Sequence, residues 1–218
     1  MKVRISLTAG LLLLLGACMS SENRKLPILG NRELVEKTVD GKTVLDTLYQ
    51  TIPSFSFINQ DSVAVTDKDF DGKIYVADFF FTSCTSICPT MHRNMLKLYE
   101  KFKDNPDVKF LSHTIDFKYD TPSRLKKYAT KLGVERDRWE FVRGSKVSIY
   151  TIAKKSYLTA VGEDSQSKDG YMHQGWFVLV DKEKRLRGAY EGTKTEEVEH
   201  LMKDIEVLLN EYKNPDAK

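Results

Sequence analysis

The chain has 218 residues, of which 41% are hydrophobic and 11% aromatic, so it can form one domain with a substantial core but not two large domains. It carries 34 basic and 31 acidic residues, a net charge of +3. Two of the basic residues lie among the first seventeen, so the remainder carries only +1. This balance excludes a broadly basic surface, and we expect no nucleic-acid partner.

The first residues have the pattern of a bacterial export signal. Lys2 and Arg4 form a basic start, and residues 7–15 form an apolar run shorter than the roughly 20 residues of a membrane-spanning helix. The sequence Leu-Gly-Ala before Cys18 resembles the bacterial lipobox, in which cleavage leaves the cysteine as the lipidated first residue. We therefore predict a lipoprotein signal peptide over residues 1–17. The mature protein would lie in the bacterial cell envelope, anchored by lipid to a membrane outside the cytoplasm and facing the periplasm. The alternative is an ordinary secretion signal followed by a chance cysteine.

Residues 18–43 are polar and show no sustained hydrophobic periodicity, which predicts a flexible tether between the lipid and the domain. We expect the folded domain over residues 44–213, without repeats or low-complexity segments. The anchor uses Cys18, so Cys84 and Cys88 are the only thiols that remain for the domain.

Within the domain, the hydrophobic pattern predicts strands that alternate with helices. The expected strands are at 48–52, 55–58, 73–81, 108–115, 139–142, 176–180 and 186–190. Helices are expected from Pro89, from Pro122 after a Thr121 cap, over 147–155, and at the end of the chain with an apolar stripe between residues 198 and 209. This order is typical of an α/β protein with a thioredoxin-like fold, a central mixed β-sheet flanked by helices.

The two cysteines of the domain lie at a predicted strand-to-helix turn, in the stretch FFFTSCTSICPT. Pro89 suits the first helical position, so Cys88 lies beside a helix N-terminus, where free N–H groups and the helix dipole favour the thiolate. A disulfide between Cys84 and Cys88 would close so short a loop that it constrains the unfolded chain little. The pattern favours thiol chemistry or metal binding, with a purely structural disulfide as the alternative.

Two families of thiol enzymes fit this turn less well. A thioredoxin has a C-x-x-C motif and a cis-proline packed opposite, yet no proline occurs here between Pro122 and Pro215. Residues 85–90 resemble the T-x-x-C-P-T motif of peroxiredoxins, but that motif requires a proline where this chain has Phe81. A general disulfide exchanger and a peroxide-reducing pair are therefore disfavoured.

The C-x-x-x-C-P turn within VADFFFTSCTSICPTM resembles the Sco/SenC family of copper-binding proteins, which help to assemble cytochrome c oxidase. The resemblance continues at Thr114-Ile115-Asp116 through Asp120-Thr121-Pro122, at His173, and from Val180-Asp181 to Gly192-Thr193. It spans about residues 50 to 210, nearly the whole domain.

This resemblance implies that Cys84, Cys88 and His173 bind copper, and that the partner is the copper-site subunit of cytochrome c oxidase. The chemistry agrees, because two soft thiolates suit Cu(I) and an added imidazole allows the same site to hold Cu(II). Zinc would require a fourth ligand. His173 follows the polar stretch 162–170, so we expect it on a mobile loop, from which a ligand can swing toward or away from the thiols.

Two carboxylates could influence such a site from behind the ligands. Asp78 interrupts an apolar strand and precedes Cys84 by six positions, the spacing of a buried carboxylate in thioredoxins. A buried charge is costly unless it is partnered, which indicates a role or a shifted pKa for Asp78. The resemblance also places Asp116 where the family has an acidic residue near the copper. For either carboxylate the alternative is a cap or a turn hydrogen bond.

The remaining histidines and methionines have simpler interpretations. We expect His92 at a solvated helix position, His113 as a satisfied structural histidine, and His200 on a charged helix face. Met91 and Met95 fit the core side of a helix, and Met172 has only its adjacency to His173 to suggest a copper role.

The sequence therefore predicts a copper-binding metallochaperone for the dinuclear copper site of the oxidase. The main alternative is an enzyme, a thiol:disulfide reductase that keeps the cysteines of the oxidase copper site reduced through Cys84 and Cys88. A third possibility is a lipoprotein whose disulfide is only structural. Tight copper binding that depends on His173 would distinguish the first from the other two.

Overall fold

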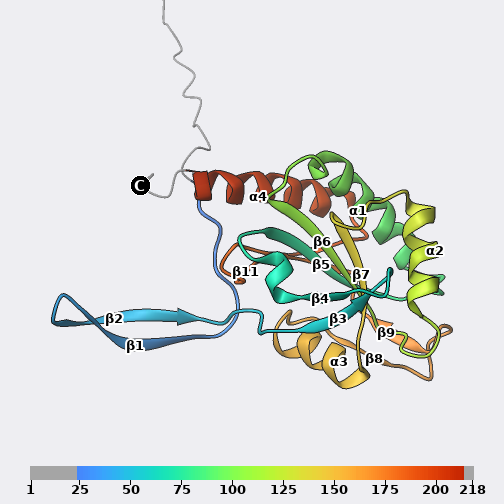
Figure 1. Cartoon of the computed structure of the whole chain (residues 1–218), viewed down its shortest axis with the longest axis horizontal. Coiled ribbons are helices and arrows are strands. Elements are labelled where there is room, and N and C mark those ends of the chain that lie inside the picture. Colours follow the sequence, from blue (N-terminus) through green and yellow to red (C-terminus); the bar gives the residue numbers. More distant parts are fainter. Residues whose placement is uncertain (1–23, 214–218) are drawn as a thin grey trace, which may run out of the picture.

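A seven-stranded mixed sheet lies at the centre of the structure, a computed structural model that describes residues 24–213 (Figure 1). The predicted signal peptide and Cys18 lie outside the described residues. The strand order is β11-β10-β5-β6-β7-β3-β4, and β5, β6 and β7 run parallel while the other neighbours are antiparallel. The strands are β3 (Ser56–Asn59), β4 (Ala64–Thr66), β5 (Ile74–Phe80), β6 (Val108–Thr114), β7 (Trp139–Arg143), β10 (Trp176–Val180) and β11 (Leu186–Glu191).

Within residues 24–213, four α-helices cover the sheet. They are α1 (Cys88–Phe102), α2 (Pro122–Leu132), α3 (Lys146–Lys155) and α4 (Thr195–Lys213), and a short 3-10 helix, η2, spans Asp67–Phe70. Figure 1 shows α1, α2 and α4 on one side of the sheet and α3 on the other. The parallel neighbours β5, β6 and β7 place both of their crossover helices on one face, as right-handed connections require. The central mixed sheet with flanking helices confirms the expected fold. No helix among residues 24–213 is both long and apolar enough to span a bilayer.

The local sequence explains where the elements that hold the site begin. Every residue of β5 is buried, because helices cover both faces of this central strand, and its apolar run is therefore continuous. α1 begins at Cys88 with Pro89 in its first turn, where a missing N–H costs nothing. α2 begins after Thr121, whose hydroxyl accepts a hydrogen bond from the backbone N–H of Arg124. The predicted Thr121 cap is confirmed.

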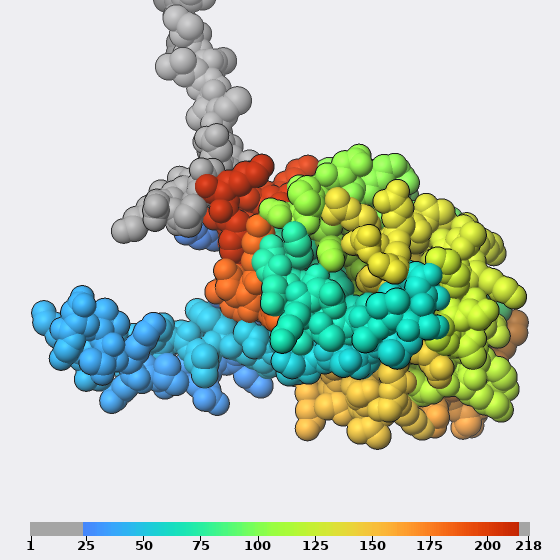
Figure 2. All heavy atoms as spheres, viewed as in Figure 1, coloured from blue at the N-terminus to red at the C-terminus, as the bar shows by residue number. Residues whose placement is uncertain are grey.

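One prediction differs at the N-terminal side of the domain. Strands β1 (Arg32–Val39) and β2 (Lys42–Tyr49) form an antiparallel hairpin that projects from the body, where we expected no regular element before residue 48 (Figures 1 and 2). The turn residues Asp40 and Gly41 have φ values of 50° and 75°, which the Asp-Gly pair adopts readily in a tight hairpin turn. The Asp40-Gly41 pair is therefore the feature of the sequence that could have predicted this hairpin. The boundary between tether and domain at residue 44 stays a prediction.

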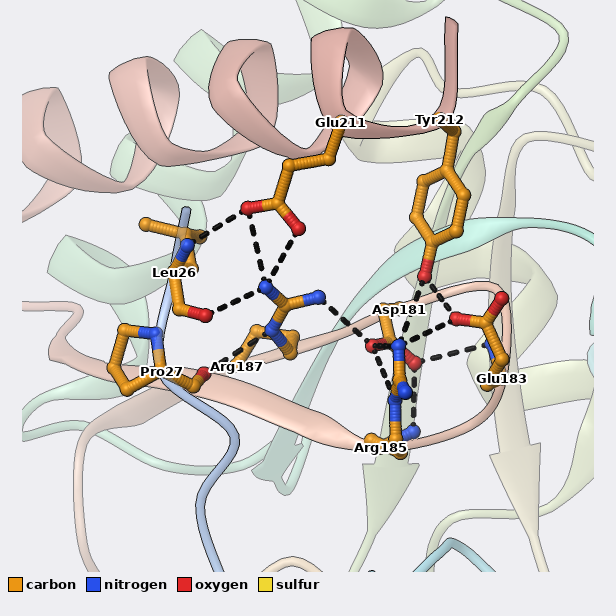
Figure 3. A network of polar contacts seen from close by, with 8 residues as sticks. All are labelled: Leu26, Pro27, Asp181, Glu183, Arg185, Arg187, Glu211 and Tyr212. Carbon is orange, nitrogen blue, oxygen red and sulfur yellow. Dashed lines mark hydrogen bonds and ion pairs between the residues drawn. The ribbon is translucent and has the colours of Figure 1, made fainter. Parts of the chain in front are cut away.

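The residues that precede the hairpin are also held by the body. The Arg187 side chain on β11 is buried and donates to the backbone carbonyls of Leu26 and Pro27, to Asp181 and to Glu211 on α4 (Figure 3). The N–H of Leu26 donates to Glu211 at 2.7 Å. A buried guanidinium must be surrounded by acceptors, so this network attaches a segment that the sequence predicted to be flexible.

Candidate metal centre

Three donor atoms from distant parts of the chain meet at the carboxyl end of β5. The Sγ atoms of Cys84 and Cys88 and a ring nitrogen of His173 lie within 4.8 Å of one another. The Nε2 atom of His173 is 3.3 Å from the Cys88 sulfur and 3.8 Å from the Cys84 sulfur. Both cysteines are free thiols. The structure thus brings together the three residues that the sequence analysis proposed as ligands.

Secondary structure fixes both cysteines. Cys84 lies in the turn after β5, and its N–H donates to the carbonyl of Phe81 at 3.2 Å. Cys88 is the first residue of α1 and is fully buried, whereas Cys84 retains 8% of its surface exposed. The ends of a strand and a helix therefore hold two sulfur atoms side by side, and Cys84 is the one that solvent can reach.

His173 comes from a small hairpin, not from an irregular loop as we expected. Strand β9 (Tyr171–His173) pairs with β8 (Val161–Glu163), and His173 lies opposite Val161. The edge of the imidazole packs against the Phe81 ring. Asp169, between the two strands, accepts hydrogen bonds from both the N–H and the hydroxyl of Thr85. These contacts fasten the hairpin to the cysteine turn.

The two thiols have opposite pKa shifts. The pKa of Cys84 is lowered to about 3, foremost because the Cys88 thiol donates a hydrogen bond to its thiolate, and further because His173 and Ser86 lie within hydrogen-bond range. The same hydrogen bond, together with burial, raises the pKa of Cys88. Burial and the neighbouring thiolate thus oppose the Cys88 thiolate that we expected from the helix N-terminus. Without metal the pair shares one proton, which must leave when both sulfurs coordinate a metal.

Asp78 lies below the centre in a buried hydrogen-bond network. Its carboxylate accepts from the hydroxyl of Ser112 at 2.5 Å and faces Nε2 of His92 at 3.2 Å. Nδ1 of His92 lies 2.6 Å from the hydroxyl of Tyr128, and the Trp139 indole donates to Ser112. The carboxylate is partnered, as its cost of burial requires. A role for Asp78 behind the ligands stays a prediction.

This network overturns the expectation for His92. We placed it at a solvated position, but it is 1% exposed. α1 begins at Cys88, so His92 lies one turn further on the same inward face and reaches Asp78 across the strand. The sequence could have indicated this contact, because it places an acid in the apolar strand β5 and a histidine on the helix α1 that packs over that strand.

Asp116 is buried at the turn after β6 and has two kinds of contact. Its Oδ1 accepts from the N–H groups of Lys118 and Tyr119, which is the turn role that we left open. The same oxygen accepts from the hydroxyl of Tyr171 at 3.2 Å. Tyr171 precedes His173 by two residues on β9, so Asp116 supports the hairpin that carries the histidine. Tyr171 was not among the expected residues, because no local pattern in the sequence marks it.

The remaining histidines and methionines of the sequence analysis lie outside the three-donor cluster. His113 is buried outside the cluster, with Nδ1 3.3 Å from the carbonyl of Asp78, and burial lowers its pKa to about 4. Its Nε2 has no hydrogen-bond partner among residues 24–213, so the imidazole is only half satisfied. Met91 and Met95 are buried in the core and His200 is exposed, which confirms those three predictions. Met172 keeps 47% of its surface exposed.

The donor set fits a soft metal. Cys84, Cys88 and His173 are the one group of metal-ligating side chains among residues 24–213 whose donor atoms lie close enough to hold an ion. They offer two sulfurs and one nitrogen. Thiolates favour Cu(I), and imidazole is a good ligand for Cu(II). A structural zinc site would require four protein ligands. The arrangement can also form a disulfide, because both thiols are free and adjacent.

The model of the SCO1/SenC family matches residues 45–210. A SCO1/SenC family lipoprotein from Bacillus anthracis is 31% identical, with a TM-score of 0.67 over 74% of this chain and 96% of that chain. BsSco, a member of the Sco family of cytochrome c oxidase assembly proteins that has a disulfide switch, is 31% identical, with a TM-score of 0.61 over 72% and 94%. Copper-bound ScoI from Arabidopsis thaliana is 23% identical, with a TM-score of 0.59 over 71% and 97%, and shares the fold.

Proposed function

Because this chain belongs to the SCO1/SenC family, we propose that Cys84, Cys88 and His173 bind copper for delivery to the dinuclear copper site of cytochrome c oxidase. The observation that carries the proposal is the meeting of two thiols and one imidazole within 4.8 Å. BsSco, which is named as an oxidase assembly protein, supports the choice of target. The oxidase subunit that carries the copper site would be the partner.

The two oxidation states of copper would use different sets of these ligands. Two thiolates suffice for Cu(I), which accepts low coordination numbers and soft donors. The imidazole of His173 adds the nitrogen that Cu(II) requires. Because His173 lies on the β8–β9 hairpin, outside the central sheet, its imidazole can turn away from the metal while the strands of that sheet stay in place. Such a ligand suits a protein that releases its cargo.

A thiol:disulfide reductase is the second candidate, and one observation favours it. The pKa of Cys84 is low, so a nucleophilic thiolate is present at neutral pH beside a protonated thiol. The Cys84 thiolate would attack a disulfide sulfur of the target and form a mixed disulfide. Cys88, on losing its proton, would then attack Cys84 and release the reduced target, and the pair would end as a disulfide.

We further propose that a lipid on Cys18 holds the protein at a membrane of the bacterial envelope. The lipobox-like sequence supports this location. So does the match to a lipoprotein of the same family. Retention of the full chain in a membrane fraction, and its release in Cys18→Ala, would test the anchor.

The test of function compares two activities in the same preparation. The full-length reduced protein in detergent would be assayed for transfer of Cu(I) to a soluble oxidase copper domain and for reduction of insulin. The metallochaperone predicts transfer that His173→Ala impairs and slow reduction of insulin. Fast reduction of insulin that His173→Ala leaves unchanged, without metal transfer, would favour the reductase instead.

A further inference from the structure

A cleft of about 300 Å³ opens beside the thiols, between the first turns of α1 and the last turns of α2. Its lining includes Cys84, His92 and Arg93 on one side and Tyr128 and Lys131 on the other. We call this the α1/α2 cleft. Cys84 lines it, whereas Cys88 and His173 do not. Anything that occupies the cleft therefore lies against the more exposed sulfur of the pair.

The rim of the cleft is positively charged. Arg93 and Lys131 line it directly, Lys97 lies one helical turn beyond Arg93, and Lys127 lies one turn before Lys131. α2 contains four basic residues and no acidic one. None of the ion pairs among residues 24–213 involves Arg93, Lys97, Lys127 or Lys131. Arg93 and Lys131 thus face the cleft without carboxylate partners among the described residues, and each helix carries a further exposed cation one turn away.

The carboxylates behind the cleft do not neutralise this rim. Asp78 is fully buried and occupied by Ser112 and His92. Asp120 is also fully buried, accepts from Thr82 and lies 3.6 Å from Arg124. Within the described part of the chain, no carboxylate lines the cleft itself. The whole chain carries only +3, so a cluster of this kind is a local excess of positive charge.

We propose that the α1/α2 cleft is the docking surface for an acidic protein segment, whose carboxylates lie against Arg93 and Lys131 beside the Cys84 sulfur. This deepens the proposed function, because the protein that exchanges metal or electrons with the thiols must approach the exposed one. Clustered charge at a cleft raises the rate of encounter with an oppositely charged partner and orients it. The cleft thus selects acidic partners by attraction and rejects basic ones by repulsion.

The test contains no copper, so its outcome is independent of metal binding. The probe is poly-L-glutamate, and the readout is the rate at which neutral iodoacetamide alkylates Cys84 in the reduced, metal-free full chain in detergent. In this reaction the thiolate displaces iodide and forms a thioether. At low salt, poly-L-glutamate should slow alkylation about 3- to 10-fold by covering the cleft, and poly-L-lysine should not. Sodium chloride at about 0.5 M should abolish the protection.

Matched variants locate the effect. Arg93→Glu/Lys131→Glu should lose the protection, and the milder Arg93→Gln/Lys131→Gln should lose most of it with less risk to folding. The control Lys154→Glu/Lys155→Glu makes the same change of charge on exposed positions of α3, on the opposite face of the sheet, and should keep the protection. Circular dichroism would confirm that each variant is folded. Absence of protection in the wild type, or equal protection in the cleft variants and the α3 control, would overturn the proposal.

Discussion

The imidazole Nε2 of His173 lies 3.3 Å from the sulfur of Cys88, although 85 positions separate the two residues in the sequence. One comes from the hairpin strand β9 and the other from the first residue of α1. The β8–β9 hairpin reaches the cysteine turn through the bonds from Thr85 to Asp169 and the packing of His173 on Phe81. This relationship makes two neighbouring thiols into a three-donor site.

Replacing the histidine should separate the two oxidation states. His173→Ala should abolish stable Cu(II) binding and its thiolate-to-copper absorption, because Cu(II) requires the nitrogen donor, while Cu(I) binding by the two thiolates is only weakened. Optical titration and competition with a Cu(I) chelator would measure this. His200→Ala, at an exposed position, is the control. Equal loss of both oxidation states, or of neither, would contradict the assignment of His173.

The reduced protein without metal should contain one thiolate per chain from about pH 5 to pH 8, because the pKa of Cys84 is lowered to about 3 while that of Cys88 is raised. Absorbance at 240 nm would count the thiolates. Cys84→Ser should remove this signal at pH 6. Cys88→Ser should raise the pKa of Cys84, because the thiol that donates to it is gone. Two thiolates at pH 6, or none, would contradict the shared proton.

Glu140 on β7 should make the fold less stable as the pH rises. Burial raises its pKa to about 7 in the folded protein, so the native state holds a proton that the unfolded chain has released. Its contribution to stability is complete below its ordinary pKa and is lost as the pH rises through about 7. Glu140→Gln keeps the acceptor for Asn59 and should stabilise the protein by about 1–2 kcal/mol at pH 8 and by little at pH 4. Urea unfolding at both pH values would measure it, with the exposed Glu199→Gln as control. An effect independent of pH would contradict this account.

The Arg187 network should matter far more for stability than a surface ion pair. Arg187→Met removes the buried cation between Asp181 and Glu211. Asp181 keeps Arg185, so we expect the free energy of unfolding to fall by about 3 kcal/mol, the lower end for a broken buried pair. Arg136→Met removes an exposed pair with Asp137 and should cost less than about 1 kcal/mol. Urea unfolding of both variants gives the comparison. Similar losses in the two would show that the network does not anchor residues 26 and 27.

Much of the fold was predictable because its elements have strong local signals. The apolar run of β5, the Thr121 cap before α2 and the stripe of α4 each identify an element without help from the rest of the chain. The β1–β2 hairpin was missed because most of its side chains are exposed. Leu34 and Leu45 keep 72% and 71% of their surface accessible, so no burial imposes a clear alternation on the hairpin. The β8–β9 hairpin is too short to show a pattern.

The sequence was enough to propose the three side chains that meet at the candidate metal centre, but not its electrostatics. The motif at Cys84 and Cys88 and the context of His173 pointed to the three donors through a family resemblance. Which sulfur ionises depends on the relative burial of the two thiols and on the donors that surround each one, and the sequence does not show these. The contact between His92 and Asp78 depends likewise on how α1 packs on β5.

The most direct measurement is a copper titration of the full-length protein in two redox states. After complete reduction, the chain should bind one copper ion, with both thiols protected from a thiol reagent, because Cys84 and Cys88 are the two sulfurs of the centre. After oxidation of this pair to a disulfide, it should bind none. Retention of copper by the oxidised protein, or full thiol reactivity in the copper-loaded reduced protein, would contradict the assignment of the metal centre.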